Sequence, residues 1–183
     1  MAKFEVVSRF KDSKIKLLPQ RKTKNSAGYD LIVAEDIVLE EYQLLAGRLW
    51  SAYRDGTSKA TPIVDLAEMA RRTKTENIKP TLVSTGVKCY MDKHEYLEIS
   101  LRSSTPLKYW IIMANSVGVI DADYVDNPDN EGEIFLQLIN LSPFPIQLKA
   151  GDCIGQAILH KFEITENDNA EGARIGGFGS TSK

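Results

Sequence analysis

The alternation of apolar and polar residues along the chain predicts that most of it forms short β-strands. The pattern is clearest at residues 87–91, 97–101 and 134–139, where every second side chain is apolar. In the last run, Phe135 and Ile139 place further apolar side chains on the opposite face, so we expect that strand to be covered on both sides. Turn-forming residues, such as Asn127–Asn130 and Ala150–Asp152, separate the runs. Many short strands with turns at close intervals indicate an all-β sandwich, jelly roll or barrel.

One segment departs from this pattern and predicts a helix near residues 61–75. Thr61 is a suitable N-cap, and Pro62 suits the first helical position. The apolar residues that follow lie at i, i+3, i+4 and i+7, which is one stripe of a helix: Ile63, Leu66, Ala67 and Ala70. The pattern favours a surface helix packed on the sheet. The alternative is an element that docks a partner or regulates the protein.

Composition limits the class of protein. A chain of 183 residues with 43% hydrophobic and 26% charged residues is expected to fold as one domain over residues 1–183. The net charge of −2 weighs against a nucleic-acid-binding protein. No apolar run approaches the roughly 20 residues that span a bilayer, and residues 1–10 lack the apolar stretch of a signal peptide. We therefore expect a cytoplasmic protein with no membrane partner.

The cysteines and histidines give no sign of a disulfide framework or a structural zinc site. Cys89 and Cys153 both lie in apolar stretches, so we expect buried free thiols. His94 and His160 are far apart in the sequence, and neither has metal-ligand spacing to the other or to a cysteine.

The glycine-rich end of the chain, residues 176–181, is a candidate phosphate-binding segment. Its glycines allow close backbone approach to phosphates, and the hydroxyls of Ser180 and Thr181 are further donors. Phe178 offers a flat ring that can stack on a base, and Arg174 offers a fork of donors for phosphate. Taken alone, the segment also fits a disordered tail.

Two internal segments carry further polar groups at strand ends. Arg102, Ser103 and Ser104 follow an alternating run and can hold a polyphosphate, although an exposed polar turn is the commoner interpretation of such a run. Asp121 follows an apolar strand, where a carboxylate can act as a general base for water. Asp121 and Asp123 are expected to project to one face, as in a turn-forming pair.

Five segments in order resemble the five motifs of the trimeric all-β dUTP pyrophosphatase family. The resemblance extends from Ala27 to Thr181 and is carried by Ala27–Leu31, Arg102–Ser104, Gly118–Tyr124, Gly151–Gln156 and Arg174–Thr181. It implies a distorted β-barrel or jelly roll that forms a homotrimer, with three active sites at the subunit boundaries. It also implies hydrolysis of dUTP to dUMP and pyrophosphate with Mg²⁺, which keeps uracil out of DNA and supplies dUMP for dTMP synthesis.

The same resemblance implies roles for individual residues. Asp121 would deprotonate the attacking water, and Tyr124 would pack under the deoxyribose. The hairpin that holds uracil would comprise Asn115, Gly118, Val119 and Ile120. The phosphates would be held by Arg102, Ser103, Ser104 and Gln156. The tail would contribute Arg174, Phe178, Gly179, Ser180 and Thr181.

Mg²⁺ would be held largely by substrate and water, with Asp30 as an outer-shell contact through water. Residues 172–183 are expected to be a mobile tail that closes over the active site, with its γ-phosphate contact from Arg174 and its uracil stack from Phe178.

The chain departs from the family pattern in several places. Leu101 stands where many members have Gly or Pro, Arg174 lies one residue closer to Phe178 than in many members, and Ser182 replaces a frequent Gly.

Two further departures concern longer segments. Residues 43–77 form an insertion that contains the predicted helix. Residues 125–131 replace the Arg-Gly that follows the tyrosine in many members, which predicts a longer hairpin tip and leaves the relation of Phe135 to uracil open.

Two alternatives remain at this stage. One is a dCTP deaminase-like enzyme of the same fold, which needs an acid–base glutamate in its pocket. The other is a dUTPase whose insertion also binds a regulatory protein.

Overall fold

Antiparallel strands make up nearly all the regular structure of the residues that the computed structural model describes, which are 1–41, 79–172, 174, 176 and 177. The insertion 43–77, with its predicted helix near 61–75, lies outside these residues, as do Phe178, Gly179, Ser180 and Thr181 of the tail. No helix in the described segments is long and apolar enough to cross a membrane.

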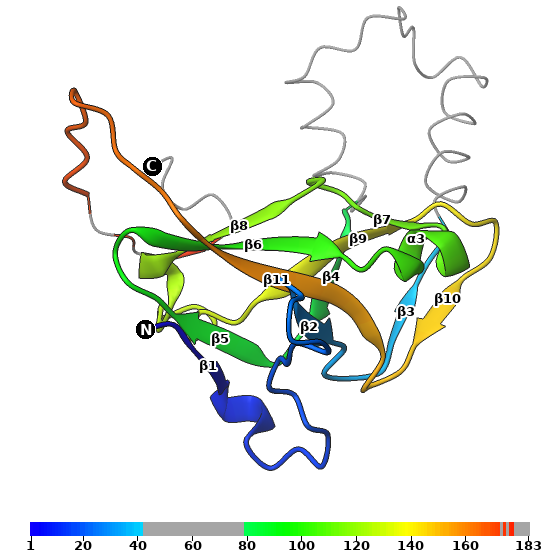
Figure 1. Ribbon diagram of the computed structural model, residues 1–183. Coiled ribbons are helices and arrows are strands. Elements are labelled where there is room, and N and C mark those ends of the chain that lie inside the picture. Colours follow the sequence, from blue (N-terminus) through cyan, green and yellow to red (C-terminus); the bar gives the residue numbers. More distant parts are fainter. Residues whose placement is uncertain (42–78, 173, 175, 178–183) are drawn as a thin grey trace, which may run out of the picture.

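The described residues contain eleven strands and three short helical segments (Figure 1). The strands are β1 (Lys3–Val6), β2 (Tyr29–Ile32), β3 (Ile37–Leu39), β4 (Thr81–Ser84), β5 (Val87–Tyr90), β6 (Glu95–Leu101), β7 (Ile111–Met113), β8 (Gly118–Asp121), β9 (Phe135–Asn140), β10 (Ile146–Leu148) and β11 (Cys153–Lys161). The helical segments are η1 (Ser8–Phe10), α3 (Ser104–Tyr109) and η2 (Ala122–Tyr124).

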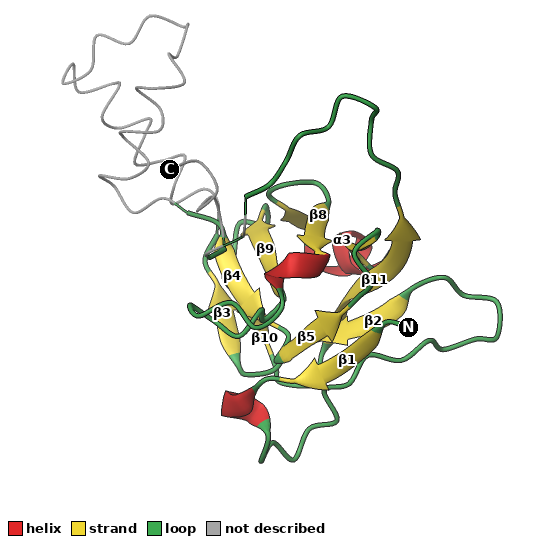
Figure 2. Ribbon diagram, turned by 90° about the vertical axis from the view of Figure 1, so that its left-hand side faces the viewer, coloured by secondary structure: helices red, strands yellow, loops and turns green. Residues whose placement is uncertain are grey.

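These strands form a four-stranded sheet in the order β2-β11-β6-β8, a three-stranded sheet in the order β4-β9-β7, and the pairs β1-β5 and β3-β10. Figure 2 shows β3, β4 and β9 on one side of a common interior, with β1, β2 and β11 on the other. Side chains from both sides meet there and are fully buried, among them Leu31, Leu97, Ile99, Leu136 and Leu138. The expected all-β jelly roll is confirmed.

The three alternating runs are all strands, as predicted, and appear as β5, β6 and β9. In β6, Leu97 and Ile99 point into the core, and the residues between them are partly exposed. β5 is buried on both faces, because the Lys88 stem is covered while its ammonium forms an ion pair with Asp126 at the surface. Both cysteines are free, with Cys89 buried and Cys153 only partly buried. Burial raises the pKa of the Cys89 thiol to about 11.

The sequence did not predict the helix α3. The polar run after β6 indicated an exposed turn or a phosphate-binding segment. The Arg102 N–H donates to the Ile154 carbonyl at 3.0 Å, and the Thr105 hydroxyl donates to the same oxygen at 2.8 Å. These two bonds fix the first turn on β11, and Thr105 is buried. Trp110 ends the helix with a positive φ of 54°. A tertiary anchor, which no local pattern reveals, therefore makes this polar run helical.

The N-terminal segment is held to the core by a buried carboxylate. Arg9 donates from Nε to Glu133 Oε2 and from Nη2 to Glu133 Oε1, both at 3.0 Å. The Gly86 N–H donates to Oε1 at 3.2 Å, and the Ser84 hydroxyl donates to the same atom. The Glu133 side chain is 4% exposed, whereas that of Arg9 is 48% exposed.

We expect Arg9→Ala to lower the free energy of unfolding by about 1–3 kcal/mol, because it leaves a buried carboxylate without its cation. Denaturant unfolding at a fixed protein concentration measures this. The matched control is Lys149→Ala, which breaks an ion pair with Asp36 whose two side chains are 56% and 54% exposed and is expected to change stability by less than about 0.5 kcal/mol. Equal losses in the two variants would contradict the role of Glu133.

Candidate active site

The segment predicted to be the uracil-holding hairpin crosses from one sheet to the other over residues 111–121, because β7 pairs with β9 and β8 pairs with β6. A cavity of about 230 Å³ lies between this predicted hairpin and β9. Its lining consists of Asn115, Gly118, Val119, Ile120, Asp121, Tyr124, Phe135, Gln137 and Arg174. The structure thus brings together all the hairpin residues predicted to hold the base and the sugar, and it places Phe135 in the same wall. Gln137 was not predicted. Its only sequence signal is that it is polar in an apolar run and shares a strand face with Phe135.

The hairpin leaves space at the cavity because of its turn and its glycine. Ser116 has a positive φ of 60°, and the Val117 N–H donates to the Asn115 carbonyl at 2.6 Å. A Cβ on Gly118 would lie 3.2 Å from Ile99 Cβ and 3.6 Å from Asn115 Nδ2. A larger residue at position 118 would therefore crowd the Asn115 amide.

Two carboxylates lie beside each other at this site: Asp121 lines the cavity, and Asp123 lines an adjoining one. Asp121 is the last residue of β8, and Asp123 follows in η2. Arg174 donates from Nε to Asp123 Oδ1 at 2.8 Å, and its Nη2 pairs with Asp121 Oδ2. The two aspartates therefore project to one face, as predicted.

The charge of Arg174 is secured by these neighbours. Burial acts to lower its pKa, but the hydrogen bond that Arg174 donates to Asp123 and the charges of Asp123 and Asp121 hold the pKa above its ordinary value. Arg174 therefore stays a cation at the mouth of the cavity.

Tyr124 forms the inner wall and is 7% exposed. Its hydroxyl donates to the Glu133 carbonyl at 3.1 Å and accepts from Asn130 Nδ2 at 2.8 Å. A Cβ on Gly177 would lie 2.8 Å from Tyr124 Cε2, so only a glycine lets the tail backbone pass so close to the ring. Burial raises the pKa of the Tyr124 phenol, which keeps it neutral.

A second cavity of about 520 Å³ adjoins the first across Asp121 and Arg174. It is also lined by Met91, Lys93, Ala122, Asp123 and Phe162. Lys93 therefore places a second cation beyond the Asp121 end. This residue lies in the turn between β5 and β6, and no motif in the sequence singled it out.

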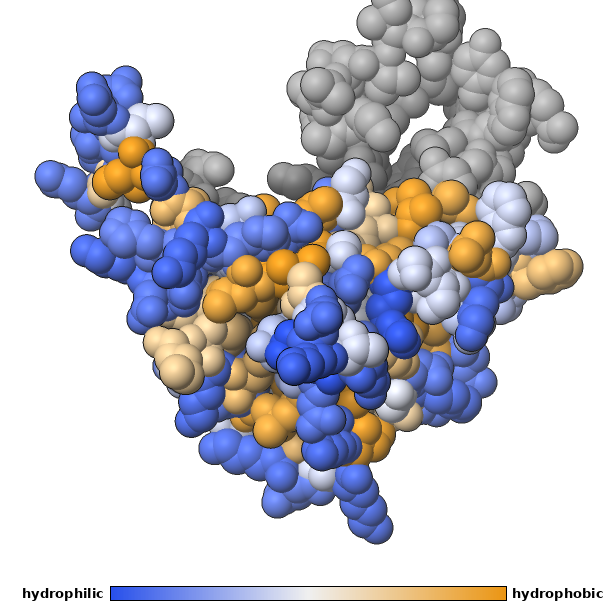
Figure 3. Space-filling view, in the orientation of Figure 1, coloured by the Kyte–Doolittle hydropathy of each residue, from blue (hydrophilic) through white to orange (hydrophobic). Residues whose placement is uncertain are grey.

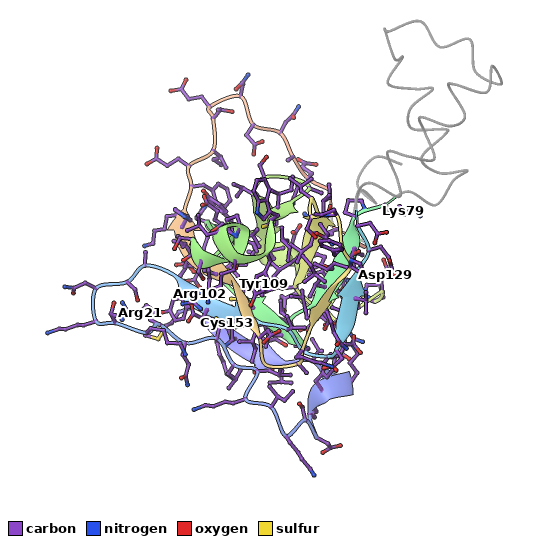
Figure 4. All side chains as sticks on the ribbon, turned by 90° about the vertical axis from the view of Figure 1, so that its right-hand side faces the viewer. Arg21, Lys79, Arg102, Tyr109, Asp129 and Cys153 are labelled. Atoms are coloured by element: carbon purple, nitrogen blue, oxygen red, sulfur yellow. The ribbon has the colours of Figure 1, made fainter. Side chains whose placement is uncertain are left out.

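The residues predicted to hold phosphates lie elsewhere in the chain, at the start of α3 and on the neighbouring strands. Arg102 Nε is 3.2 Å from Asp30 Oδ1, and Asp30 is the cross-strand partner of Gln156. A Cβ on Gly28 would lie 2.5 Å from Gln156 Oε1, so a larger residue at position 28 would clash with the Gln156 amide. Figure 4 shows Arg102 close to Cys153 and α3. Ser103 and Ser104 begin the same helix.

One chain holds Asp121 and Arg102 at opposite ends of β6. Asp121 is opposite Tyr96, and Gly118 is opposite Ile99, whereas Arg102 directly follows Leu101. Tyr96 and Leu101 are five residues apart, which is about 17 Å along a strand. The order along the sheet is therefore Arg102, then the Gly118 part of the cavity, then Asp121. The structure does not bring the two groups together within one chain.

Asp30 is the residue predicted to contact a metal through water. Its Oδ2 atom is buried without a hydrogen-bond partner, and Lys22 Nζ lies 3.9 Å away. Across the described part of the chain, no group of three or more His, Cys, Asp or Glu residues is placed to hold a metal ion.

Comparisons with known proteins agree on one family. The dUTPase family profile matches residues 59–182. A deoxyuridine 5′-triphosphate nucleotidohydrolase of Lactococcus lactis is 33% identical over 180 residues, which are 97% of this chain and 95% of that protein. One of Wolinella succinogenes is 38% identical over 109 residues, or 56% of this chain and 68% of that protein.

Solved structures give the same result. The crystal structure of a dUTPase from Streptococcus mutans has a TM-score of 0.66 and 33% identity, and the match covers 90% of this chain and 98% of that one. The dUTPase of phage phi11 of Staphylococcus aureus has a TM-score of 0.60 at 16% identity, covering 94% and 97% of the two chains, and so supports the fold alone. With a family profile that matches most of its length, and a relative aligned over nearly all of it, the chain belongs to the dUTPase family.

Proposed function

We propose that this chain hydrolyses dUTP to dUMP and pyrophosphate. The observation that carries the proposal is the cavity beside the predicted hairpin, with a carboxylate at its mouth and a buried tyrosine as its wall. A flat pyrimidine fits between the hairpin and Phe135, where the Asn115 amide can donate to and accept from the base edge. The sugar then lies against Tyr124, and the α-phosphorus lies towards Asp121.

The chemistry is an attack of water on the α-phosphorus. Asp121 takes a proton from the water, the new P–O bond forms, and the bond between the α-phosphorus and the bridging oxygen breaks. Pyrophosphate leaves with the electron pair of that bond. Asp121 is half exposed, so water reaches it from the open side, and an ionised carboxylate within hydrogen-bond reach is a suitable base.

Arg174 connects binding to this step. In the present structure its guanidinium neutralises Asp121 and Asp123. A triphosphate at the cavity mouth offers Arg174 a more highly charged partner. When Arg174 moves to the phosphates, the Asp121 carboxylate becomes free to accept a proton.

Mg²⁺ suits this site as an ion carried by the substrate. Mg²⁺ retains several waters and is commonly held by one or two carboxylates together with phosphate oxygens. Asp30, with its unpartnered buried Oδ2, is the residue that would orient a water of that ion. When bound, the ion would neutralise the charge of the leaving pyrophosphate.

The position of Arg102 supports a homotrimer with shared sites. The base end of the cavity lies between Arg102 and Asp121, so phosphates that extend past Asp121 move away from the Arg102 of the same chain. This supports the proposal that Arg102, Ser103, Ser104 and Gln156 serve a nucleotide bound to another chain. Leu107 and Trp110 beside them are 84% and 68% exposed, and Figure 3 shows apolar surface on this side of the molecule. Such a surface suits contact with another copy.

A nucleotide panel tests the activity and the nearest alternative. A dCTP deaminase needs an acid–base glutamate in its pocket, and no glutamate lines either cavity in the described part of the chain. With Mg²⁺ present, we expect pyrophosphate release from dUTP and little from dCTP, dTTP or UTP. Ammonia release from dCTP in place of pyrophosphate release from dUTP would refute the proposal.

We expect Asp121→Asn to lower kcat for dUTP by about 10²–10⁴-fold, because the amide keeps the shape but accepts no proton. Affinity for dUMP should be largely retained, which calorimetry measures. The matched control is Asp129→Asn on the exposed hairpin tip, which should retain wild-type turnover. Turnover of Asp121→Asn within threefold of wild type would show that Asp121 is not the base.

Shared sites predict that two inactive variants restore each other. Asp121→Asn and Arg102→Ala should each be nearly inactive alone. Refolded together in equal amounts, they should give about a quarter of the wild-type activity, since random mixing in a symmetric trimer pairs an intact Asp121 with an intact Arg102 in that share of sites.

The control mixes the Asp121→Asn, Arg102→Ala double variant with an equal amount of Asp121→Asn, and it should stay inactive. Native mass spectrometry verifies that mixed trimers form. Mixed trimers without restored activity would reject the shared site.

A further inference from the structure

Tyr124 is held at two points by the loop that follows it. The Asn127 amide donates to the Tyr124 carbonyl at 2.9 Å, and the Asn130 amide donates to the Tyr124 hydroxyl at 2.8 Å. The hydroxyl in turn donates to the Glu133 carbonyl at 3.1 Å. Both the donor and an acceptor site of the phenol are therefore used, and the ring has one favoured orientation.

The two asparagines are themselves fixed by the loop. Asn127 is 6% exposed, and its Oδ1 accepts from the N–H groups of Asp129 and Asn130 at 3.1 and 3.2 Å. Its Nδ2 also donates to Asn130 Oδ1 at 2.8 Å, and that oxygen accepts from the Gly132 N–H at 3.0 Å. Each amide is oriented by several hydrogen bonds, so the Asn130 Nδ2 donor is already directed at the Tyr124 hydroxyl.

The loop also has anchors that form no hydrogen bond with the Tyr124 side chain. The Asp126 carboxylate accepts from the Tyr90 hydroxyl at 2.9–3.0 Å and forms an ion pair with Lys88. Gly132 has a φ of 79°, and a Cβ there would lie 2.6 Å from Val125 Cα. A substitution at Asp126 can therefore weaken the attachment of the loop without removing the hydrogen bond between Asn130 and the Tyr124 hydroxyl.

The Tyr124 side chain lines the cavity together with Asp121. We propose that Asn130, oriented by Asn127, is a positioning residue that keeps this ring as a rigid wall and so sets the preference for deoxyribose over ribose. This inference rests on the proposed function, because it assigns the sugar to the Tyr124 wall. A rigid wall rejects an added 2′-hydroxyl, whereas a ring that can move aside admits it.

A double-mutant cycle tests the inference through nucleotide binding. The probes are dUMP and UMP, and calorimetry gives the ratio of their Kd values. We expect Asn130→Ala and Tyr124→Phe each to lower the preference for dUMP about tenfold. The double variant should lose no more than about threefold beyond either single variant, because both changes remove the same hydrogen bond between Asn130 and the Tyr124 hydroxyl. Multiplied losses in the double variant would overturn the inference.

A matched control and a spectroscopic readout separate positioning from loosening of the loop. Asp126→Asn weakens the anchor of the same loop and should leave the dUMP preference unchanged. In protein with ¹³C-labelled tyrosine, Asn130→Ala should shift the Tyr124 Cζ signal, which is identified by its absence in Tyr124→Phe. Asp126→Asn should shift the Tyr90 signal instead. The inference would also be overturned if Asp126→Asn lost the dUMP preference as much as Asn130→Ala does. An unchanged Tyr124 Cζ signal in Asn130→Ala would overturn it as well.

The same samples distinguish this inference from the proposed function. Wild-type protein that releases no pyrophosphate from dUTP would refute the proposed hydrolysis. The binding ratios and the Tyr124 signal would still decide whether Asn130 positions the ring.

Discussion

The pairing of β6 with β11 on one side and β8 on the other is the constraint on which the rest of the structure depends. It aligns Tyr96 with Asp121 and Ile99 with Gly118. Since side chains alternate between the faces of a strand, a slip by one residue would turn Asp121 to the other face and would also expose the β6 side chains that fill the core. The burial of Leu97 and Ile99 therefore fixes the position of Asp121, the proposed catalytic base, through the register of β6 and β8.

Electrostatics at the cavity mouth follow from this placement. Asp121 and Asp123 concentrate negative charge at a point where the proposed substrate brings more, and Arg174 forms ion pairs with both carboxylates. In the proposed function, a bound triphosphate would compete for the same guanidinium. An exchange of Arg174 from the carboxylates to the phosphates would make the proposed base available only when there is a substrate to act on. A chain with a net charge of −2 would thus accept a polyanion through a few placed cations, and Lys93 in the adjoining cavity is a candidate.

Much of the fold could be predicted from local signals in the sequence, because period-two alternation identified β5, β6 and β9. The hairpin and its proposed contact with the base came instead from the resemblance to a family, which Gly118–Tyr124 helps to carry. The sequence did not reveal features that depend on residues far away in the chain. The helix α3 is anchored because the Thr105 hydroxyl donates to the Ile154 carbonyl on β11. Lys93 lines the second cavity only because the fold brings its turn next to Asp121. The tip after Tyr124 was recognised as longer than usual, but the roles of Asn127 and Asn130 depend on hydrogen bonds that sequence spacing does not show.

The division of the site along β6 connects catalysis to assembly. Each chain carries a base cavity at one end of this strand and the Arg102 group at the other, so every chain contributes to two sites in the proposed homotrimer. The Arg102 group stands at the start of α3, beside the exposed side chains of Leu107 and Trp110. Burying those apolar side chains against a second copy is favourable, and the same contact delivers Arg102 to the phosphates. An unassembled chain would then bind the base without holding the triphosphate, so hydrolysis would require assembly.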